Sequence, residues 1–166
     1  MKTIDDLWGL PEGAEIGLEA NPNNAATAKL DAFKVAGINR LSLGVQSFHD
    51  VALKQLGRDH DGAAARTAIT AAVERFPSIS ADLIFGWHGQ TEELLRADIQ
   101  ALLDLKVNHI STYQLTIEDG TAFAKAEARG DVQAVNDDQS ADFYDLVRGQ
   151  LSGCLLYTSP SPRDRG

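Results

Sequence analysis

The sequence predicts an α/β fold in which parallel strands line the inside of a barrel and helices cover its outside. Segments with a two-residue alternation, typical of strands, take turns with segments of helical periodicity, and short turns join them. Right-handed crossovers then bring the strands into one parallel sheet. Each strand has an apolar face and a face rich in small or polar residues, which favours a barrel with a ligand-binding lumen over a sheet buried on both faces.

The first two predicted strands carry polar side chains near their carboxyl ends, where barrels of this kind hold their ligands. The first strand spans residues 15–20 and has Glu19 on its polar face. The second strand, residues 40–48, alternates most clearly. Its apolar set and its small or polar set are Leu41, Leu43 and Val45 against Ser42, Gly44 and Gln46. Because the second set leaves space and ends in a carboxamide, we expect it to form a pocket wall.

The third and fourth predicted strands repeat this alternation. The third, residues 78–85, has Ser80 and Asp82 opposite an apolar face, with Ile84 as the one apolar exception on their side. The fourth, residues 109–117, is expected to have Gln114 on its polar face, opposite Ser111 and Tyr113. The members expected beside Gln114 are Ile110, Thr112 and Thr116. These assignments place Glu19, Gln46 and Gln114 at carboxyl ends of strands.

Amphipathic helices, not membrane spans, are predicted around the strands. Asn23 or Asn24 is expected to cap the helix after the first strand, and Gly37 to end it in the left-handed conformation. Asp61 and Thr91 are expected to cap the next two helices. In chain order, the predicted helices cover residues 3–8, 25–36, 62–76, 91–105 and 137–153.

The charges indicate an ordinary solvated surface. There are 24 acidic and 15 basic side chains, which give a formal net charge of −9 at pH 7. An acidic chain without a basic stripe argues against nucleic acid as the main partner. Helix acids such as Glu92, Glu93 and Asp98 are expected to face solvent. The run of residues 59–61, Asp-His-Asp, is interpreted as a solvated turn with a helix cap, not as a metal site. Because the sequence shows no signal-peptide layout, we expect a cytoplasmic location.

The chain is expected to be a fragment with one folded part, residues 1–153, and a tail, residues 154–166. A complete barrel of this kind takes about 200 to 250 residues, and only four of its strand–helix units are visible in this sequence. Residues 154–164 read CLLYTSPSPRD, which we interpret as the translation of a sequencing adapter read in frame. A natural Ser/Pro linker is the alternative. The tail holds the only cysteine, Cys154, so residues 1–153 offer no thiolate ligand.

Five sequence blocks between residues 15 and 151 resemble, in order, the oxygen-independent coproporphyrinogen III oxidase family of radical S-adenosylmethionine proteins. The blocks are EANP at 19–22, NRLSLGVQSF at 39–48, LGR at 56–58, DLIFG at 82–86 with GQT at 89–91, and YQLTIE at 113–118 with GT at 120–121. The third and fifth blocks are similar to the heme-chaperone branch of the family. Trp87 and His88 stand where the family usually has a leucine-proline pair, so the resemblance does not determine the geometry of the turn after the third strand.

The resemblance implies a partial (β/α)6 barrel that holds a [4Fe–4S] cluster and S-adenosylmethionine. The family binds the cluster through three cysteines spaced Cys-x3-Cys-x2-Cys on the loop after its first strand, and a glycine-rich turn follows the second. Neither feature is present in this sequence. A longer version of the protein is expected to contain both upstream of Met1.

The resemblance also implies which residues bind S-adenosylmethionine, and it implies no catalytic residue and no metal ligand in this chain. Glu19 matches an acceptor for ribose hydroxyls or the methionyl ammonium, and Arg58 matches a donor to the ligand's carboxylate. Gln46 and Asp82 match polar positions of the same lumen, and Thr116 matches a position near adenosine. For each residue the alternative is a buried polar group satisfied by its neighbours.

Three functions remain open at this point. The first is a heme chaperone that binds heme and passes it to a hemoprotein. The second is an oxygen-independent coproporphyrinogen III oxidase, which removes two propionate carboxyls as CO2 to form protoporphyrinogen IX. The third, which rests on the residues alone, is an ordinary parallel barrel with a small-molecule lumen. Whether the chain is part of an enzyme therefore stays undecided by the sequence.

Overall fold

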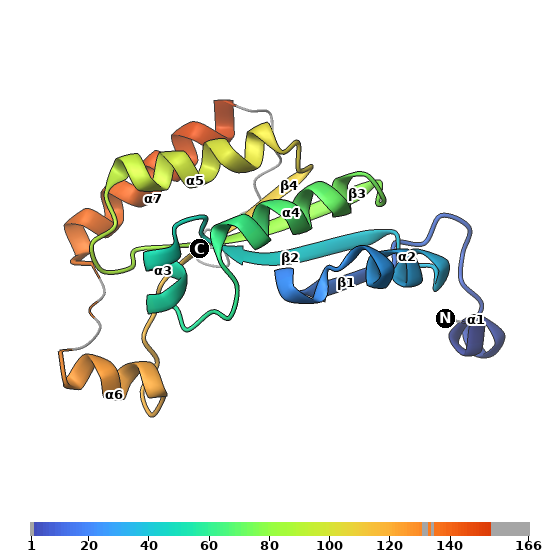
Figure 1. Cartoon of the computed structure of the whole chain (residues 1–166), viewed down its shortest axis with the longest axis horizontal. Helices are drawn as coiled ribbons and strands as arrows, with labels where there is room; N and C mark the ends of the chain where they lie inside the picture. The colour runs from blue at the N-terminus through green and yellow to red at the C-terminus, as the bar shows by residue number, and fades with distance from the viewer. Residues whose placement is uncertain (1, 131–132, 134, 154–166) are drawn as a thin grey trace, which may run out of the picture.

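Four parallel strands form a single sheet in the computed structural model, which describes residues 2–130, 133 and 135–153. The predicted tail at 154–166 lies outside the described residues. Strand order in the sheet is β1-β2-β3-β4, so neighbours in sequence are also neighbours in space (Figure 1). The strands are β1 (Gly17–Ala20), β2 (Arg40–Gln46), β3 (Ser78–Phe85) and β4 (His109–Gln114). The predicted α/β class and parallel sheet are confirmed.

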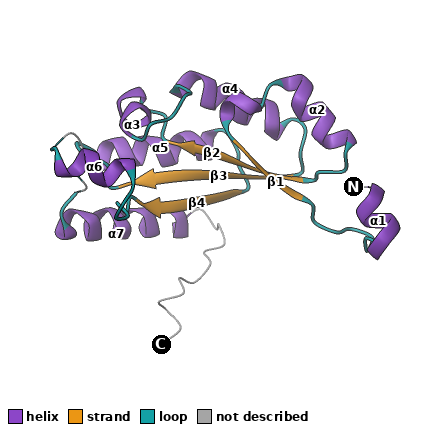
Figure 2. Cartoon of the chain, turned by 90° about the horizontal axis from the view of Figure 1, so that it is seen from below, coloured by secondary structure: helices purple, strands orange, loops and turns teal. Residues whose placement is uncertain are grey.

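Helices connect the strands, and four of them, α2, α4, α5 and α7, lie along one face of the sheet (Figures 1 and 2). The helices are α1 (Lys2–Trp8), the 3-10 helix η1 (Pro22–Asn24), α2 (Thr27–Val35), α3 (Asp50–Gln55), α4 (Gly62–Val73), α5 (Glu92–Asp104), α6 (Ala122–Ala128) and α7 (Asp137–Gly153). The short helices α3 and α6, of six and seven residues, are not among the predicted helices. Within the described part of the chain, no helix is long and apolar enough to cross a membrane.

The core lies between the sheet and these four helices. On β2 and β3 the predicted apolar faces are buried, which confirms the alternation read from those strands. Fully or almost fully buried members are Leu41, Leu43, Val45, Ile79, Ala81, Leu83 and Phe85. Leu30 of α2, Ile69 of α4 and Ile99 of α5 complete the core from the helix side.

Two of the predicted helix caps are confirmed and one is wrong. Asp61 accepts a hydrogen bond from the Ala64 amide at 2.7 Å, and Thr91 accepts one from the Leu94 amide at 3.4 Å. Asn23 and Asn24 do not cap α2, whose N-cap is Ala26 without a side-chain bond. The physical reason is that the two asparagines lie inside η1, which begins at Pro22, so the helix starts later than expected.

The predicted polar face of β4 is also wrong. In the register of the sheet, Ser111 lies beside Asp82 and Tyr113 lies beside Ile84. Asp82 and Ile84 are two residues apart and share one face of β3, so Ser111 and Tyr113 lie on that same face. Ile110, which is 8% exposed, belongs to the core instead. Gln114 therefore alternates toward the helix side. Because β4 ends at Gln114, Thr116 lies beyond the strand.

Candidate functional site

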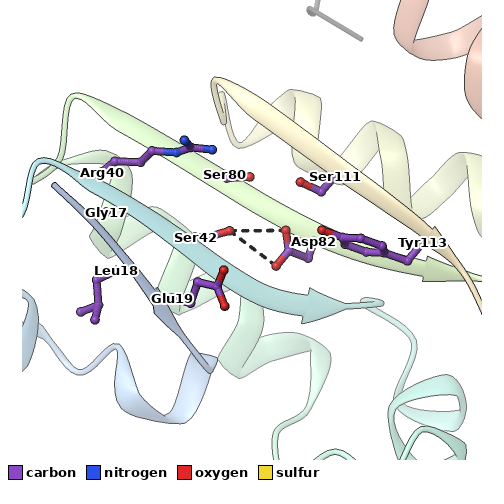
Figure 3. Close-up of a pocket in the computed structure, with 9 residues that line it drawn as sticks. All are labelled: Gly17, Leu18, Glu19, Arg40, Ser42, Ser80, Asp82, Ser111 and Tyr113. Atoms are coloured by element: carbon purple, nitrogen blue, oxygen red, sulfur yellow. Dashed lines mark hydrogen bonds between the residues drawn. The ribbon is translucent and has the colours of Figure 1, made fainter. Parts of the chain in front are cut away.

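The sheet face opposite the core contains two adjoining cavities of about 320 and 430 Å³. We call them together the polar trough. The two cavities share four lining residues, namely Leu18, Glu19, Ser42 and Asp82. Figure 3 shows Glu19, Ser42 and Asp82 from three neighbouring strands with their oxygen atoms close together. The trough thus forms where the small residues predicted for this face leave space.

Asp82 lies at the centre of the trough and is partly buried. Burial raises the pKa of its carboxyl above the ordinary value of 3.8, and the negative charge of Glu19 adds to this effect. Hydrogen bonds from the hydroxyls of Ser111 and Ser42 act in the opposite direction and lower the pKa. The Ser42 hydroxyl lies 3.4 and 3.5 Å from the two carboxylate oxygens. Two carboxylates facing one cavity suit a ligand that carries hydroxyl or ammonium donors.

Gln46 lines the larger cavity, as the sequence predicts for this face. It is 8% exposed and has a φ of 68°, which is uncommon for a residue other than glycine. Its carboxamide folds back over Gly44, because a Cβ placed on Gly44 would lie 2.9 Å from Gln46 Nε2. The register to β3 slips by one residue between Leu43 and Gln46, which marks a β-bulge at this end of the strand.

Asp98 is buried, so the expectation that it faces solvent is wrong. The side chain projects from α5 into the connection after β2 and is 1% exposed. Its Oδ2 accepts a hydrogen bond from Ser47 Oγ at 2.7 Å, and its Oδ1 accepts one from the Phe48 amide at 2.8 Å. His49 Nε2 lies 3.5 Å from Oδ1. Burial raises the pKa of Asp98 above 3.8, while these hydrogen bonds and the charge of His49 lower it.

His60 differs from its prediction in a similar way. The turn does provide the helix cap Asp61, but the His60 ring is buried and not solvated. Its Nε2 lies 3.1 Å from the carbonyl oxygen of Val45, so this nitrogen carries the proton and donates. His60 therefore supports the carboxyl end of β2, next to Gln46.

Arg58 and Thr116 lie outside the residues that line the trough. Arg58 is exposed in the connection between α3 and α4, and its amide donates to the Leu53 carbonyl at 2.9 Å. Thr116 is exposed beyond β4, with its hydroxyl 3.5 Å from the Gln114 carbonyl oxygen. Their assignments as ligand-binding residues stay predictions, as do those of Glu19, Gln46 and Asp82.

Some trough residues escape prediction from the sequence. Arg40 lines the smaller cavity near the start of β2 and pairs with Glu15 at 2.9 Å. Ser111 and Tyr113 were on the wrong face in the sequence prediction. The signal that identifies them is the register between β3 and β4, which the sequence of one strand does not contain.

The polar side chains of the trough fit S-adenosylmethionine and do not fit an iron–sulfur cluster. Glu19, Asp82 and Gln46 offer acceptor oxygens for an ammonium group and for ribose hydroxyls. The described residues contain no group of three or more His, Cys, Asp or Glu side chains placed to hold a metal ion. The single cysteine of the sequence, Cys154, cannot provide the three thiolates that such a cluster takes from the protein.

Comparison with known sequences finds similar proteins over most of this chain. Residues 2–105 match the model of the family described as the Radical SAM superfamily. The heme chaperone HemW of Mycobacterium tuberculosis (strain ATCC 25618 / H37Rv) is 37% identical over 150 residues, which cover 90% of this chain and 38% of that protein. Radical S-adenosyl methionine domain-containing protein 1, mitochondrial, of Mus musculus is 40% identical over 143 residues, which cover 86% of this chain and 32% of that protein.

A solved structure shows the same fold. Coproporphyrinogen III oxidase (HemN) from Escherichia coli, described as a radical SAM enzyme, is similar with a TM-score of 0.77 at 24% sequence identity. The similarity covers 92% of this chain and 35% of that one. It confirms the predicted partial barrel. The chain spans about a third of the length of each of these three proteins.

Proposed function

The chain belongs to the radical S-adenosylmethionine superfamily, and from this membership we propose that its polar trough binds S-adenosylmethionine. Two carboxylates and a carboxamide on one sheet face support the proposal, with Glu19 and Gln46 at the carboxyl ends of their strands and Asp82 in the middle of β3. The residues that we assign to the ligand are Glu19, Gln46, Arg58, Asp82 and Thr116. The first, second and fourth already line the trough, and the other two follow the carboxyl ends of β2 and β4 in the chain.

Each residue has a separate task in this proposal. The Glu19 and Asp82 carboxylates accept hydrogen bonds from the methionyl ammonium and ribose hydroxyls, and Gln46 supplies one donor and one acceptor. The guanidinium of Arg58 pairs with the ligand's carboxylate, which requires its exposed side chain to turn toward the trough. Thr116 lies beside the adenosine. When bound, S-adenosylmethionine and a [4Fe–4S] cluster supply one-electron chemistry, with the cluster thiolates coming from outside this chain.

For the intact protein that contains this chain, we propose the function of a cytoplasmic heme chaperone. The observation that supports it is the 37% identity to a protein named heme chaperone HemW, over nine-tenths of this chain. In this proposal the intact protein binds heme and passes it to a hemoprotein. Coproporphyrinogen III oxidase is the competing function, since the structure of that enzyme has the same fold.

Two assays on one preparation distinguish these functions. The intact protein is reconstituted with iron and sulfide under anaerobic conditions, and heme binding is followed by its absorbance. Release of CO2 from coproporphyrinogen III is then measured with and without S-adenosylmethionine. We expect heme binding and heme transfer to an apo-hemoprotein without CO2 release. Release of CO2 that depends on S-adenosylmethionine would replace the chaperone by the decarboxylase.

A further inference from the structure

The carboxyl end of β2 adopts a strained turn centred on Gln46. The Ser47 amide donates to the Val45 carbonyl at 2.8 Å, which closes a three-residue turn, and Gln46 at its centre has a φ of 68°. Turns of this kind with positive φ are rare and strained. A residue other than glycine keeps such a conformation only where its surroundings enforce it, and such residues gather at functional sites.

The buried carboxylate of Asp98 is the main restraint on this turn. It receives the Ser47 hydroxyl at 2.7 Å and the Phe48 amide at 2.8 Å, so it fixes the two residues directly after Gln46. Asp98 belongs to α5, which follows the next strand, and the Ser47 contact joins positions 51 residues apart in sequence. A tertiary contact, and not the local sequence, therefore determines the turn.

Two further contacts restrain the same segment. The ring of His60 donates to the Val45 carbonyl at 3.1 Å and so holds the residue before Gln46. Gly62, at the start of α4, lies against the Phe48 backbone, because a Cβ at this position would be 2.2 Å from the Phe48 carbonyl oxygen. The backbone on both sides of Gln46 is thus fixed by groups from other parts of the chain.

This arrangement fixes the direction of the Gln46 side chain. The carboxamide lies over Gly44, faces the larger cavity and is almost completely buried. A buried carboxylate such as Asp98 is expensive, and apolar side chains of similar volume often stabilise a fold equally well or better. The presence of a carboxylate at this position is therefore better explained by the geometry that it imposes than by the stability that it adds.

We propose that Asp98 is a positioning residue, whose carboxylate holds the turn at Gln46 so that the Gln46 carboxamide is preorganised in the polar trough. The inference rests on the proposed function, because S-adenosylmethionine is the ligand for which the carboxamide is prepared. Asp98 itself does not line the trough and acts only through Gln46.

A double-mutant cycle tests this role in the intact protein. The four proteins are the parent, Asp98→Asn, Gln46→Ala and the double variant, and Asp104→Asn on the exposed side of α5 serves as the matched control. S-adenosylmethionine affinity is measured by calorimetry. Hydrogen exchange of residues 45–49 is measured without ligand. Asparagine keeps the shape of Asp98, but it has one acceptor oxygen where the two contacts need two.

We expect Asp98→Asn to weaken S-adenosylmethionine binding about tenfold, since a charge-assisted contact is lost, and to speed up exchange at residues 45–49. In the Gln46→Ala background the same change should have no further effect on affinity, because Asp98 acts through Gln46. The Asp104→Asn control should bind like the parent.

Parent-like affinity in folded Asp98→Asn protein would overturn the inference, as would independent losses that multiply in the double variant. A parent that binds no S-adenosylmethionine would instead contradict the proposed function. In that case, unchanged hydrogen exchange at residues 45–49 in Asp98→Asn would still refute the proposal that Asp98 holds the turn at Gln46. Faster exchange would support it.

Discussion

Replacing Gly62 by alanine should destabilise the fold, because Gly62 lies against the Phe48 backbone. A Cβ at this position would lie 2.2 Å from the Phe48 carbonyl oxygen and 2.9 Å from its carbonyl carbon, whereas ordinary contacts begin at 3.4 Å. The oxygen would have to move by the difference, 3.4 minus 2.2, or 1.2 Å. The obstacle is backbone held by Asp98, so it cannot rotate away as a flexible side chain would.

The expected loss follows from two opposing contributions. Overpacking of this kind costs about 1 to 3 kcal/mol, and a backbone obstacle places the cost near the upper end. The helix propensity of alanine returns about 0.5 to 1 kcal/mol. We therefore expect Gly62→Ala to lower the free energy of unfolding by about 2 kcal/mol.

Urea unfolding of the intact protein measures this change, and Gly149→Ala is the matched control. Gly149 is exposed on α7, and no atom lies within 4 Å of a Cβ placed there. That substitution should raise the free energy of unfolding by about 0.5 to 1 kcal/mol. If Gly62→Ala also stabilises the protein, the close approach between α4 and the β2 connection is wrong.

Three further outcomes follow from the structure. Asp61→Ala removes the hydrogen bond to the Ala64 amide and should cost about 1 kcal/mol of unfolding free energy in urea titrations; no loss would exclude the cap. Phe143→Ala should lower the free energy of unfolding by about 3 to 5 kcal/mol, because this side chain of α7 is 1% exposed and lies in the core. A loss below about 0.5 kcal/mol, typical of a surface position, would show that α7 does not pack against the core. Burial raises the pKa of Asp82 above 3.8, so its contribution to stability is present below 3.8 and lost as the pH rises through the raised value. Asp82→Asn should thus gain stability relative to the parent as the pH rises through that window, and a pH-independent difference between their urea midpoints would contradict the shift.

Alternation along β2 and β3 is sufficient to predict the buried face, because each apolar set is almost uninterrupted. On β4 both faces mix polar and apolar residues, so alternation separates the faces without saying which one is buried. The pairing of Ser111 with Asp82 determines it, and this pairing is a property of the sheet as a whole.

Asp98 and Gln46 show a second limit of sequence reasoning. Asp98 shares the apolar stripe of α5 with Leu95 and Leu102, at helical spacings of three and four residues, and this was a signal against a solvated side chain. Its partners, however, lie in the connection after β2, where only the tertiary structure brings them together. The positive φ of Gln46 is equally absent from the sequence, since the turn depends on those contacts.

The most direct test of the central claim is the affinity of the intact, anaerobically reconstituted protein for S-adenosylmethionine. Glu19→Gln should weaken binding by about tenfold to a hundredfold, since a lost charge-assisted hydrogen bond costs about 1.5 to 3 kcal/mol. Arg58→Ala should weaken binding to a similar extent, iron content should stay at the parent value, and exposed Glu12→Gln should bind like the parent. Parent-like affinity in both Glu19→Gln and Arg58→Ala would contradict the assignment of these two residues to the S-adenosylmethionine site.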